Sequence, residues 1–158
     1  MTDISGIHPA LAFAGRLRAG TPAIAGWFCP AEPAFAEMVA RGPLDAVVLD
    51  VQHGLHDLRS VVDCVGAITA AGKPALVRTP VGDFALAARA LDVGAVGVIA
   101  AMIDTAADAR AFVAQVKYPP RGRRSWGAGT AMARLGVDTP SDYLHGADDA
   151  TLALAMIE

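Results

Sequence analysis

The residues best suited to chemistry follow a short apolar run. Residues 46–49 read Ala-Val-Val-Leu, and Asp50, Gln52 and His53 come directly after them. A run of branched apolar residues is typical of a strand buried on both faces, and α/β proteins bind their ligands at the carboxyl ends of such strands. An imidazole titrates near neutral pH, so His53 is a candidate general base. The alternative is a histidine that bonds only to local backbone at the start of a loop.

Further charged residues stand at or near the ends of other predicted elements. Arg78 ends an apolar strand and needs an anion, either a structural carboxylate or one on a substrate. Glu158 follows the last predicted strand and could ligate a hard cation such as Mg²⁺ or Mn²⁺, although one carboxylate is not a metal site. Asp50 could hold a metal-bound water, orient the histidine or cap the loop. Asp92 ends a predicted helix, so its approach to the other groups is the least secure on geometry.

A basic, glycine-rich stretch covers residues 122–129. It lacks the pattern GxxxxGK[ST] of a phosphate loop and does not run from a strand into a helix. Its arginines, with Arg121 just before it, could still meet a phosphate or a carboxylate. We expect a loop close to the site, with Trp126 as an apolar lid or a subunit contact.

The remaining cysteines and histidines carry no recognisable motif. Cys29 and Cys64 lie far apart without the spacing of a zinc site, and we expect two buried free thiols. We expect His56 and His145 to lie in solvent, and we assign no chemistry to them or to His8.

The composition narrows the class of protein. The chain has 158 residues, of which 54% are hydrophobic and 18% are charged, and this indicates one folded domain over residues 1–158. A formal net charge of −3 gives no broad attraction to nucleic acid or to an acidic membrane. The first residues lack the pattern of a signal peptide, and no window reaches about 18 uninterrupted apolar residues. We therefore expect a cytoplasmic protein.

Strands and helices alternate along the chain. The predicted strands cover residues 23–28, 46–51, 75–78, 96–100 and 151–157. The predicted helices cover 33–41, 58–71 with Asp57 as its cap, 84–91, and a segment that Asp104 or Thr105 caps and that extends to 116. Residues 1–20 are predicted to be an arm with a short helix, and residues 118–150 a long loop region with one or two helical turns at 141–145.

This alternation predicts a parallel sheet with right-handed crossovers. Two architectures compete, an open doubly wound sheet and a (β/α)₈ barrel, which usually takes about 250 residues. Five strands in 158 residues match the density of a barrel but supply only five of its eight strands. Because Glu158 ends the chain directly after an apolar strand, we expect an α/β fragment of a longer protein, either part of an open sheet or the N-terminal portion of a TIM barrel with about five of its eight strands.

Five short motifs occur here in the order seen in one enzyme family. The chain resembles the HpcH/HpaI aldolases, which are metal-dependent class II pyruvate aldolases of the 4-hydroxy-2-oxoheptane-1,7-dioate aldolase type. The resemblance runs from about residue 20 to the end, and it is the combination of motifs that is specific. They are Asp50-Val51-Gln52-His53-Gly54, Val77-Arg78-Thr79-Pro80, Leu91-Asp92-Val93-Gly94-Ala95, Tyr118-Pro119-Pro120-Arg121-Gly122 and Met156-Ile157-Glu158.

The resemblance implies a barrel of the phosphoenolpyruvate/pyruvate superfamily, often a hexamer, that uses Mg²⁺, Mn²⁺ or Co²⁺. It implies reversible cleavage of a 4-hydroxy-2-oxo acid to pyruvate and an aldehyde. By motif, His53 corresponds to the base beside a metal-bound water, and Asp92 to the carboxylate that raises its basicity. Arg78 corresponds to the group that holds the pyruvate oxygen and stabilises the enolate. Glu158 corresponds to one of two acidic metal ligands, and Asp50 belongs to the same network.

The chain also departs from the family pattern. Gln52 stands where many members have glutamate, and we place it with Arg78 among the substrate-binding residues. Met156 replaces a frequent glutamine, and its motif also resembles the citrate lyase and malyl-CoA lyase branch. The second acidic ligand, expected after a sixth strand, lies beyond Glu158. Two alternatives stay open: a lyase acting on a CoA thioester, and a non-catalytic α/β fragment or interaction module.

Overall fold

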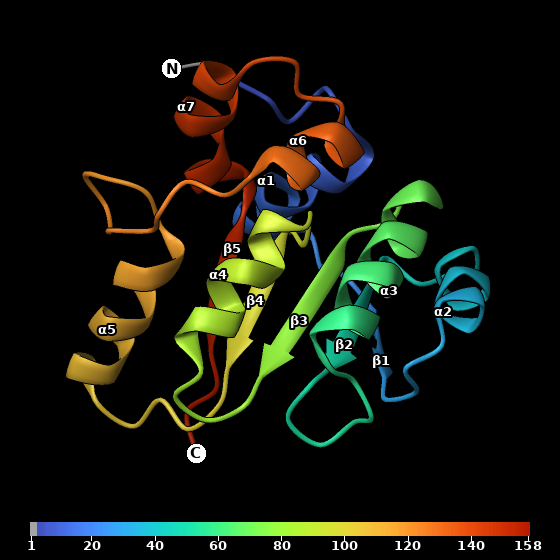
Figure 1. The fold of residues 1–158 in the computed structure, drawn as a ribbon, viewed down its shortest axis with the longest axis horizontal. Coiled ribbons are helices and arrows are strands. Elements are labelled where there is room, and N and C mark those ends of the chain that lie inside the picture. The colour runs from blue at the N-terminus through green and yellow to red at the C-terminus, as the bar shows by residue number, and fades with distance from the viewer. Residues whose placement is uncertain (1–2) are drawn as a thin grey trace.

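The computed structural model describes residues 3–158 and is built on a parallel sheet of five strands. The strands are β1 (Ala25–Phe28), β2 (Ala46–Asp50), β3 (Ala75–Thr79), β4 (Gly97–Ala100) and β5 (Leu152–Ala155). Their order in the sheet is β1-β2-β3-β4-β5, and each pair is parallel (Figure 1). A doubly wound sheet reverses its strand order at a switch point, whereas the strands of a barrel follow the chain. The order is therefore that of a barrel wall.

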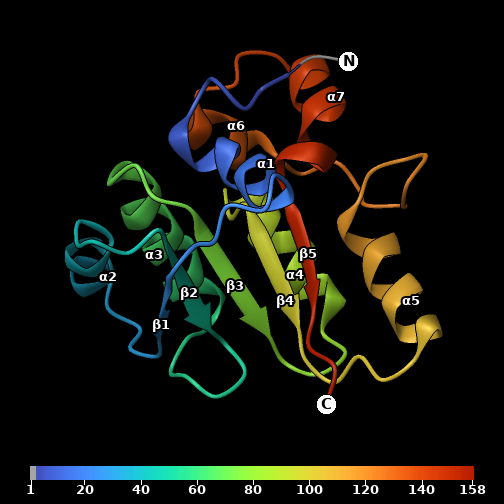
Figure 2. The same cartoon turned by 180° about the vertical axis from the view of Figure 1, so that it is seen from behind.

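Helices cover both faces of this sheet. One face carries α2 (Pro33–Ala40), α3 (Leu58–Ala70), α4 (Phe84–Asp92) and α5 (Ala106–Val116), as Figure 1 shows. The other face is covered near its amino ends by the 3₁₀ helix η1 (Pro9–Ala12) and by α1 (Phe13–Arg18), which Figure 2 shows in front of the sheet. The predicted arm with a short helix agrees with η1 and α1.

The apolar runs form strands because both of their faces are buried. Val47, Val77 and Val98 belong to the core shared with the outer helices, where Cys64 and Ile68 of α3 meet them. The residues that alternate with them lie in a second cluster on the other face, which includes Phe13 of α1: Val48, Leu76, Ile99 and Leu152. A run without polar alternation is what a strand between two apolar layers requires.

The predicted helix starts are confirmed by their caps. The Asp57 carboxylate accepts a hydrogen bond from the Ser60 amide at 2.8 Å, and the Thr105 hydroxyl accepts one from the Asp108 amide at 3.1 Å. Both are capping boxes, because the side chain of the third helical residue bonds back to the cap. Gly72, with a φ of +78°, follows the end of α3. Every strand boundary lies within two residues of its predicted place.

The prediction of a long loop over 118–150 is wrong, because this region contains α6 (Gly129–Leu135) and α7 (Pro140–Ala150). The inward face of α7 is built mostly from small residues, Gly146, Ala147 and Ala150, around Tyr143. Such a face lacks the large apolar residues that mark a helix in a sequence. α7 is consequently longer than the one or two turns predicted at 141–145.

Two predictions for single residues are also wrong. His56 is buried, with Nε2 3.2 Å from the Phe28 carbonyl oxygen, because the segment after β2 folds back onto the end of β1. Burial lowers the pKa of His56. Cys29 is exposed, while Cys64 is buried as predicted and its burial raises its pKa to about 11.

Within residues 3–158, no helix is both long enough and apolar enough to cross a membrane.

Candidate functional site

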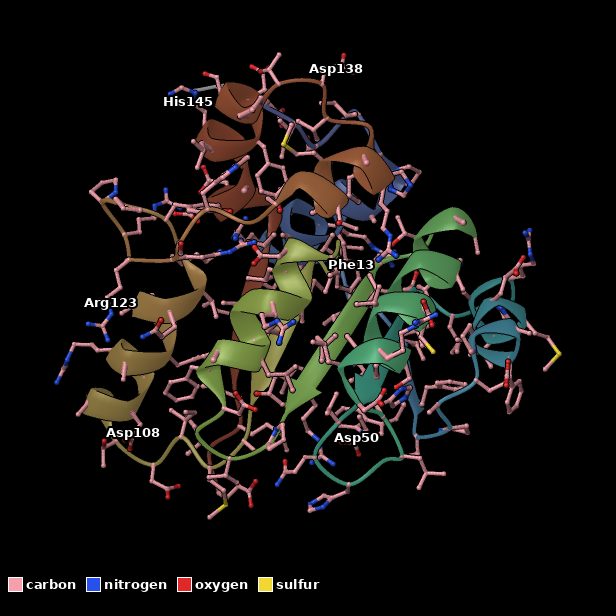
Figure 3. The ribbon with its side chains drawn as sticks, in the orientation of Figure 1. Phe13, Asp50, Asp108, Arg123, Asp138 and His145 are labelled. Carbon is pink, nitrogen blue, oxygen red and sulfur yellow. The ribbon has the colours of Figure 1, made fainter. Side chains whose placement is uncertain are left out.

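Asp50 and Arg78 form an ion pair at the carboxyl edge of the sheet, the edge at which the strands end. The register between β2 and β3 places the two residues side by side. Arg78 donates from Nε to Asp50 Oδ1 at 2.9 Å and from Nη2 to Oδ2 at 2.6 Å. The side chains are 3% exposed for Asp50 and 11% for Arg78. This two-pronged geometry is the strong form of an arginine–carboxylate pair, and Figure 3 labels Asp50 at this edge.

The oxygens of Asp50 are fully engaged. Oδ1 also accepts the backbone N–H groups of Gln52 and His53, each at 3.1 Å, and Oδ2 accepts Trp27 Nε1–H at 3.1 Å. Burial by itself would raise the pKa of Asp50, but the hydrogen bonds from Arg78 and Trp27 outweigh it and hold the pKa well below its usual range. Of the roles left open for Asp50, the structure displays the loop cap.

Trp27 is a component of this edge that the sequence analysis did not single out. Its indole N–H bonds Asp50, and the Arg78 guanidinium carbon lies 5.0 Å from the centre of its ring. A cation over an aromatic face is attracted to it. Trp27 is half exposed, so one side of its ring remains open to a ligand. The available signal was an indole at the end of an apolar strand, since its N–H needs an acceptor.

Arg78 keeps one donor nitrogen for a ligand. Its Nε and Nη2 are taken by Asp50, and within residues 3–158 Nη1 has no hydrogen-bond partner. The hydrogen bonds to the Asp50 carboxylate raise the pKa of Arg78. The guanidinium is therefore a permanent cation with a fixed direction and a free N–H group.

His53 is exposed on the loop that follows β2. Asp50 holds its backbone amide, and Gly54 closes the turn with its N–H 3.1 Å from the Asp50 carbonyl oxygen. A Cβ on Gly54 would collide with that carbonyl and lie 2.9 Å from the Cys29 carbonyl oxygen, so the turn requires glycine. In the described part of the chain the His53 ring makes no hydrogen bond, so its two nitrogens are open to a ligand.

Gln52 and Glu158 add oxygen atoms near the same edge. Gln52 Oε1 is buried without a hydrogen-bond partner in the described chain, as expected of an acceptor that a ligand would satisfy. Glu158 is exposed beyond β5, whose extension pairs with β4 through the Met156 amide and the Ala100 carbonyl at 2.9 Å.

These donors are of the right kind for a hard cation but are too few. Among residues 3–158 no group of three or more histidine, cysteine, aspartate or glutamate residues could hold a metal ion. Asp50 has no oxygen to spare, so Glu158 is the candidate ligand that remains. The described residues do not by themselves make a metal site.

Met102 marks backbone strain at this edge. Its φ is +56°, which is uncommon for a residue other than glycine, and it stands two residues after the end of β4. The next amide, that of Ile103, donates to the Met156 carbonyl at 2.9 Å and joins the ends of β4 and β5. Strain of this kind gathers at functional sites, and no local sequence pattern predicts it at Met102.

Asp92 does not lie with the other predicted site residues. It ends α4, which returns from the carboxyl edge to the amino edge, and the chain then enters β4 at Gly97 (Figure 1). There Asp92 Oδ1 accepts a hydrogen bond from Arg124 Nη2 at 2.6 Å. The convergence expected for Asp92 is therefore absent within one chain.

The basic loop is also at the amino edge, so within one chain it does not lie over the carboxyl edge as predicted. It follows α5, which returns in the same direction as α4. Arg121 pairs with Asp149 of α7 at 2.5 Å, and Arg124 is buried. Trp126 lies beside Tyr118, with 6.2 Å between the ring centres.

The order of the strands and the covering helices define a barrel-type α/β protein, and the polar groups at the carboxyl edge are its candidate ligand site. Residues 24–158 match the model of the HpcH/HpaI aldolase/citrate lyase family. The chain belongs to this family, which confirms the resemblance found in its motifs.

Relatives and solved structures agree with this assignment. The chain is 40% identical over 139 residues to a hydroxypyruvate/pyruvate aldolase from Rhizorhabdus wittichii, covering 88% of this chain and 54% of that protein. It is 36% identical over 148 residues to a 4-hydroxy-2-oxo-heptane-1,7-dioate aldolase from Salmonella arizonae, covering 93% of this chain and 56% of that protein. The crystal structure of an HpcH/HpaI aldolase from Desulfitobacterium hafniense superposes with a TM-score of 0.79 at 28% identity, covering 91% of this chain and 56% of that one.

The chain thus spans about half the length of the curated relatives that it matches. Its five strands correspond to part of the barrel of the solved relatives, and the predicted partial TIM barrel is confirmed.

Proposed function

We propose that this protein is a divalent-metal-dependent aldolase that reversibly cleaves a 4-hydroxy-2-oxo acid into pyruvate and an aldehyde. The proposal is carried by the Asp50–Arg78 pair, which holds a guanidinium with one free N–H group at the carboxyl edge beside His53. The relatives named as pyruvate aldolases support the same chemistry.

The chemistry asks for two groups that this edge supplies. Breaking the bond between C3 and C4 requires that the 4-hydroxyl group lose its proton, and His53 accepts it. The electron pair of the broken bond passes into the enolate of pyruvate, which places negative charge on the 2-oxo oxygen. Arg78 Nη1 donates a hydrogen bond to that oxygen, where the charge develops. The enolate becomes pyruvate when C3 takes up a proton, and the proton that His53 accepted is the one returned, so the base is regenerated. In the reverse direction His53 removes a proton from C3 of pyruvate and gives it to the new hydroxyl group.

The rest of the edge keeps these two groups in place. Asp50 and Trp27 fix the Arg78 guanidinium, and Asp50 also fixes the backbone of Gln52 and His53. Gln52 Oε1 is an acceptor for a hydroxyl group of the substrate. A bound Mg²⁺, Mn²⁺ or Co²⁺ ion would act as a Lewis acid on the 2-oxo acid. Glu158 would be its ligand from the described chain.

Asp92 enters the proposal only through a second copy of the chain. Within one chain it lies at the opposite edge of the sheet from His53. Raising the basicity of His53, the role that the resemblance implies, therefore requires that another copy bring its Asp92 to this site. We accordingly propose a homo-oligomer, a hexamer by the resemblance, in which two copies share each site.

The alternative of a CoA-thioester lyase gains no support from the basic loop. A CoA lyase would need cations for the phosphates of CoA, and the arginines of this loop are the candidates. Arg121 is paired with Asp149 and Arg124 is buried against Asp92, while Arg123 is exposed. The loop lies at the edge opposite to Arg78.

The test compares two reactions of the whole gene product after metal removal and readdition. With Mg²⁺, Mn²⁺ or Co²⁺ we expect pyruvate release from a 4-hydroxy-2-oxo acid and no acetyl-CoA release from malyl-CoA. Acetyl-CoA release alone would favour the CoA-thioester lyase. The absence of product from both substrates with every metal would favour a non-catalytic module.

A further inference from the structure

In the ion pair of Asp92 and Arg124 at the amino edge, the arginine is much more deeply buried than the aspartate. The Arg124 side chain is 1% exposed, whereas the Asp92 side chain is 24% exposed. The bond from Arg124 Nη2 to Asp92 Oδ1 is 2.6 Å long. The cation is thus enclosed in the protein, and the carboxylate lies between it and the surface.

Several contacts hold Arg124 in this position. Its backbone N–H donates to the Lys117 carbonyl at 2.9 Å, which anchors the loop to the end of α5. Its guanidinium carbon lies 4.6 Å from the centre of the Tyr118 ring, an attractive cation–π distance. Tyr143 packs edge-on to Tyr118, with 6.5 Å between ring centres, and closes the enclosure.

Stability alone does not explain why an arginine is buried at position 124. Arg124 Nε and Nη1 are buried without a hydrogen-bond partner among the described residues, and an unpaired buried donor is unfavourable. A well-packed apolar side chain of similar volume is often as stable as a buried ion pair or more so. The feature that the arginine provides and an apolar residue does not is a hydrogen bond that fixes the Asp92 carboxylate in place.

Gly127 leaves the second oxygen of Asp92 unobstructed. A Cβ built on Gly127 would lie 2.6 Å from Asp92 Oδ2 and 2.9 Å from its Cγ. The backbone of Gly127 is outside the left-handed region, so its conformation does not require glycine. Glycine is needed at position 127 because a side chain there would fill the space beside Asp92 Oδ2.

We propose that Arg124 and Gly127 are positioning residues that hold the Asp92 carboxylate by Oδ1 and keep Oδ2 free to accept a hydrogen bond. The inference rests on the proposed function, in which the donor is the His53 imidazole of a second copy. Arg124 fixes the orientation of the Asp92 carboxylate through Oδ1. The absence of a side chain at Gly127 leaves space for the imidazole to reach Oδ2.

The test is a double-mutant cycle in the whole gene product, with kcat and KM measured for pyruvate release. We expect Asp92→Asn to lower kcat by about 10- to 100-fold, as loss of an orienting partner does. Arg124→Gln and Gly127→Ala should each lower kcat by about tenfold or more, with KM for the 2-oxo acid nearly unchanged. Because Arg124 acts through Asp92, the double variant Asp92→Asn/Arg124→Gln should match Asp92→Asn alone.

Matched control variants distinguish a loss of activity caused by a misplaced Asp92 from one caused by a loss of folding. Gly129→Ala adds a methyl group two residues away where nothing lies within 4 Å, and Arg59→Gln removes an exposed arginine. Both should keep the kcat of the unmodified protein. Thermal unfolding of every variant is followed in parallel, and Gly127→Ala tests the inference even where Arg124→Gln does not fold.

Two results would overturn the inference in distinguishable ways. Losses that multiply in the double variant, or an unchanged kcat in Gly127→Ala, would show that Arg124 and Gly127 do not act through Asp92 and would leave the proposed reaction standing. An unchanged kcat in Asp92→Asn would remove the role proposed for Asp92 itself.

Discussion

Two aspartate–arginine pairs lie at opposite edges of this sheet, and each leaves a different partner free. At the carboxyl edge, Asp50 is saturated by Arg78, by Trp27 and by two backbone amides, while Arg78 keeps its Nη1 unpaired. At the amino edge, Arg124 is enclosed and binds only one oxygen of Asp92, whose Oδ2 faces the space beside Gly127.

The difference shows that the same two residue types can present opposite charges. A carboxylate that accepts several hydrogen bonds serves as an anchor, and the group offered to a ligand is the cation that it holds. A guanidinium enclosed by aromatic rings serves as the anchor in the second pair, and the group offered is the carboxylate. The partner with the lower exposure is the anchor in both pairs.

The first test asks whether the chemistry resides at the carboxyl edge. His53→Ala should lower turnover by about two to four orders of magnitude, the usual contribution of a general base. Steady-state pyruvate release measures it. His145→Ala, an exposed histidine on α7, is the control and should be neutral. Near-normal turnover in His53→Ala would remove this residue from the role of base.

The second test concerns the free nitrogen of Arg78. Arg78→Lys should lower turnover by about 100-fold, because one ammonium group cannot pair with both Asp50 oxygens and still donate in a fixed direction to the substrate. Arg59→Lys, made in an exposed pair with Asp63, should have no effect. Full activity in Arg78→Lys would show that Arg78 has only a structural role. The carboxyl edge would then offer no cation to a ligand, and the proposed difference between the two pairs would not hold.

The third test measures Asp50 as an anchor. Asp50→Asn leaves the Arg78 guanidinium buried beside a neutral amide, and the free energy of unfolding should fall by about 3 kcal/mol. Urea denaturation measures the change, with Asp63→Asn as the exposed control. Asp92→Asn should also lower the free energy of unfolding, because it leaves the enclosed Arg124 guanidinium beside a neutral amide. An unchanged free energy of unfolding in Asp50→Asn would contradict the role of Asp50 as an anchor.

The fourth test follows the same anchor with pH. Because the pKa of Asp50 is lower in the folded than in the unfolded protein, the unfolded state binds more protons in acid. The stability that Asp50 contributes is complete above the ordinary pKa of aspartate, about 4. It is lost as pH falls through the depressed folded value. Unfolding free energies at pH 7, 5 and 3 should therefore fall less steeply in Asp50→Asn than in the unmodified protein, and parallel profiles would contradict this.

The strands, the helix caps and half of the site followed from local sequence. Apolar runs such as 46–49 can be buried on both faces only as inner strands, and Asp57 and Thr105 precede segments of helical period. The placement of Asp50 and Arg78 at strand ends followed from the same runs. Helix α6 was missed and α7 was predicted only as one or two turns at 141–145, because small residues such as Ala131, Gly146 and Ala147 on their buried faces give little periodic signal.

The tertiary structure decided how the polar groups are paired. Asp50 meets Arg78, 28 residues away, through the register of two strands, and Trp27 joins them from a third. The direction of the chain decided the position of Asp92, since a helix that connects parallel strands must end at the edge where the next strand begins. A sequence specifies which residues can bear charge, but burial and register select which of the two charges in each pair is left for a ligand.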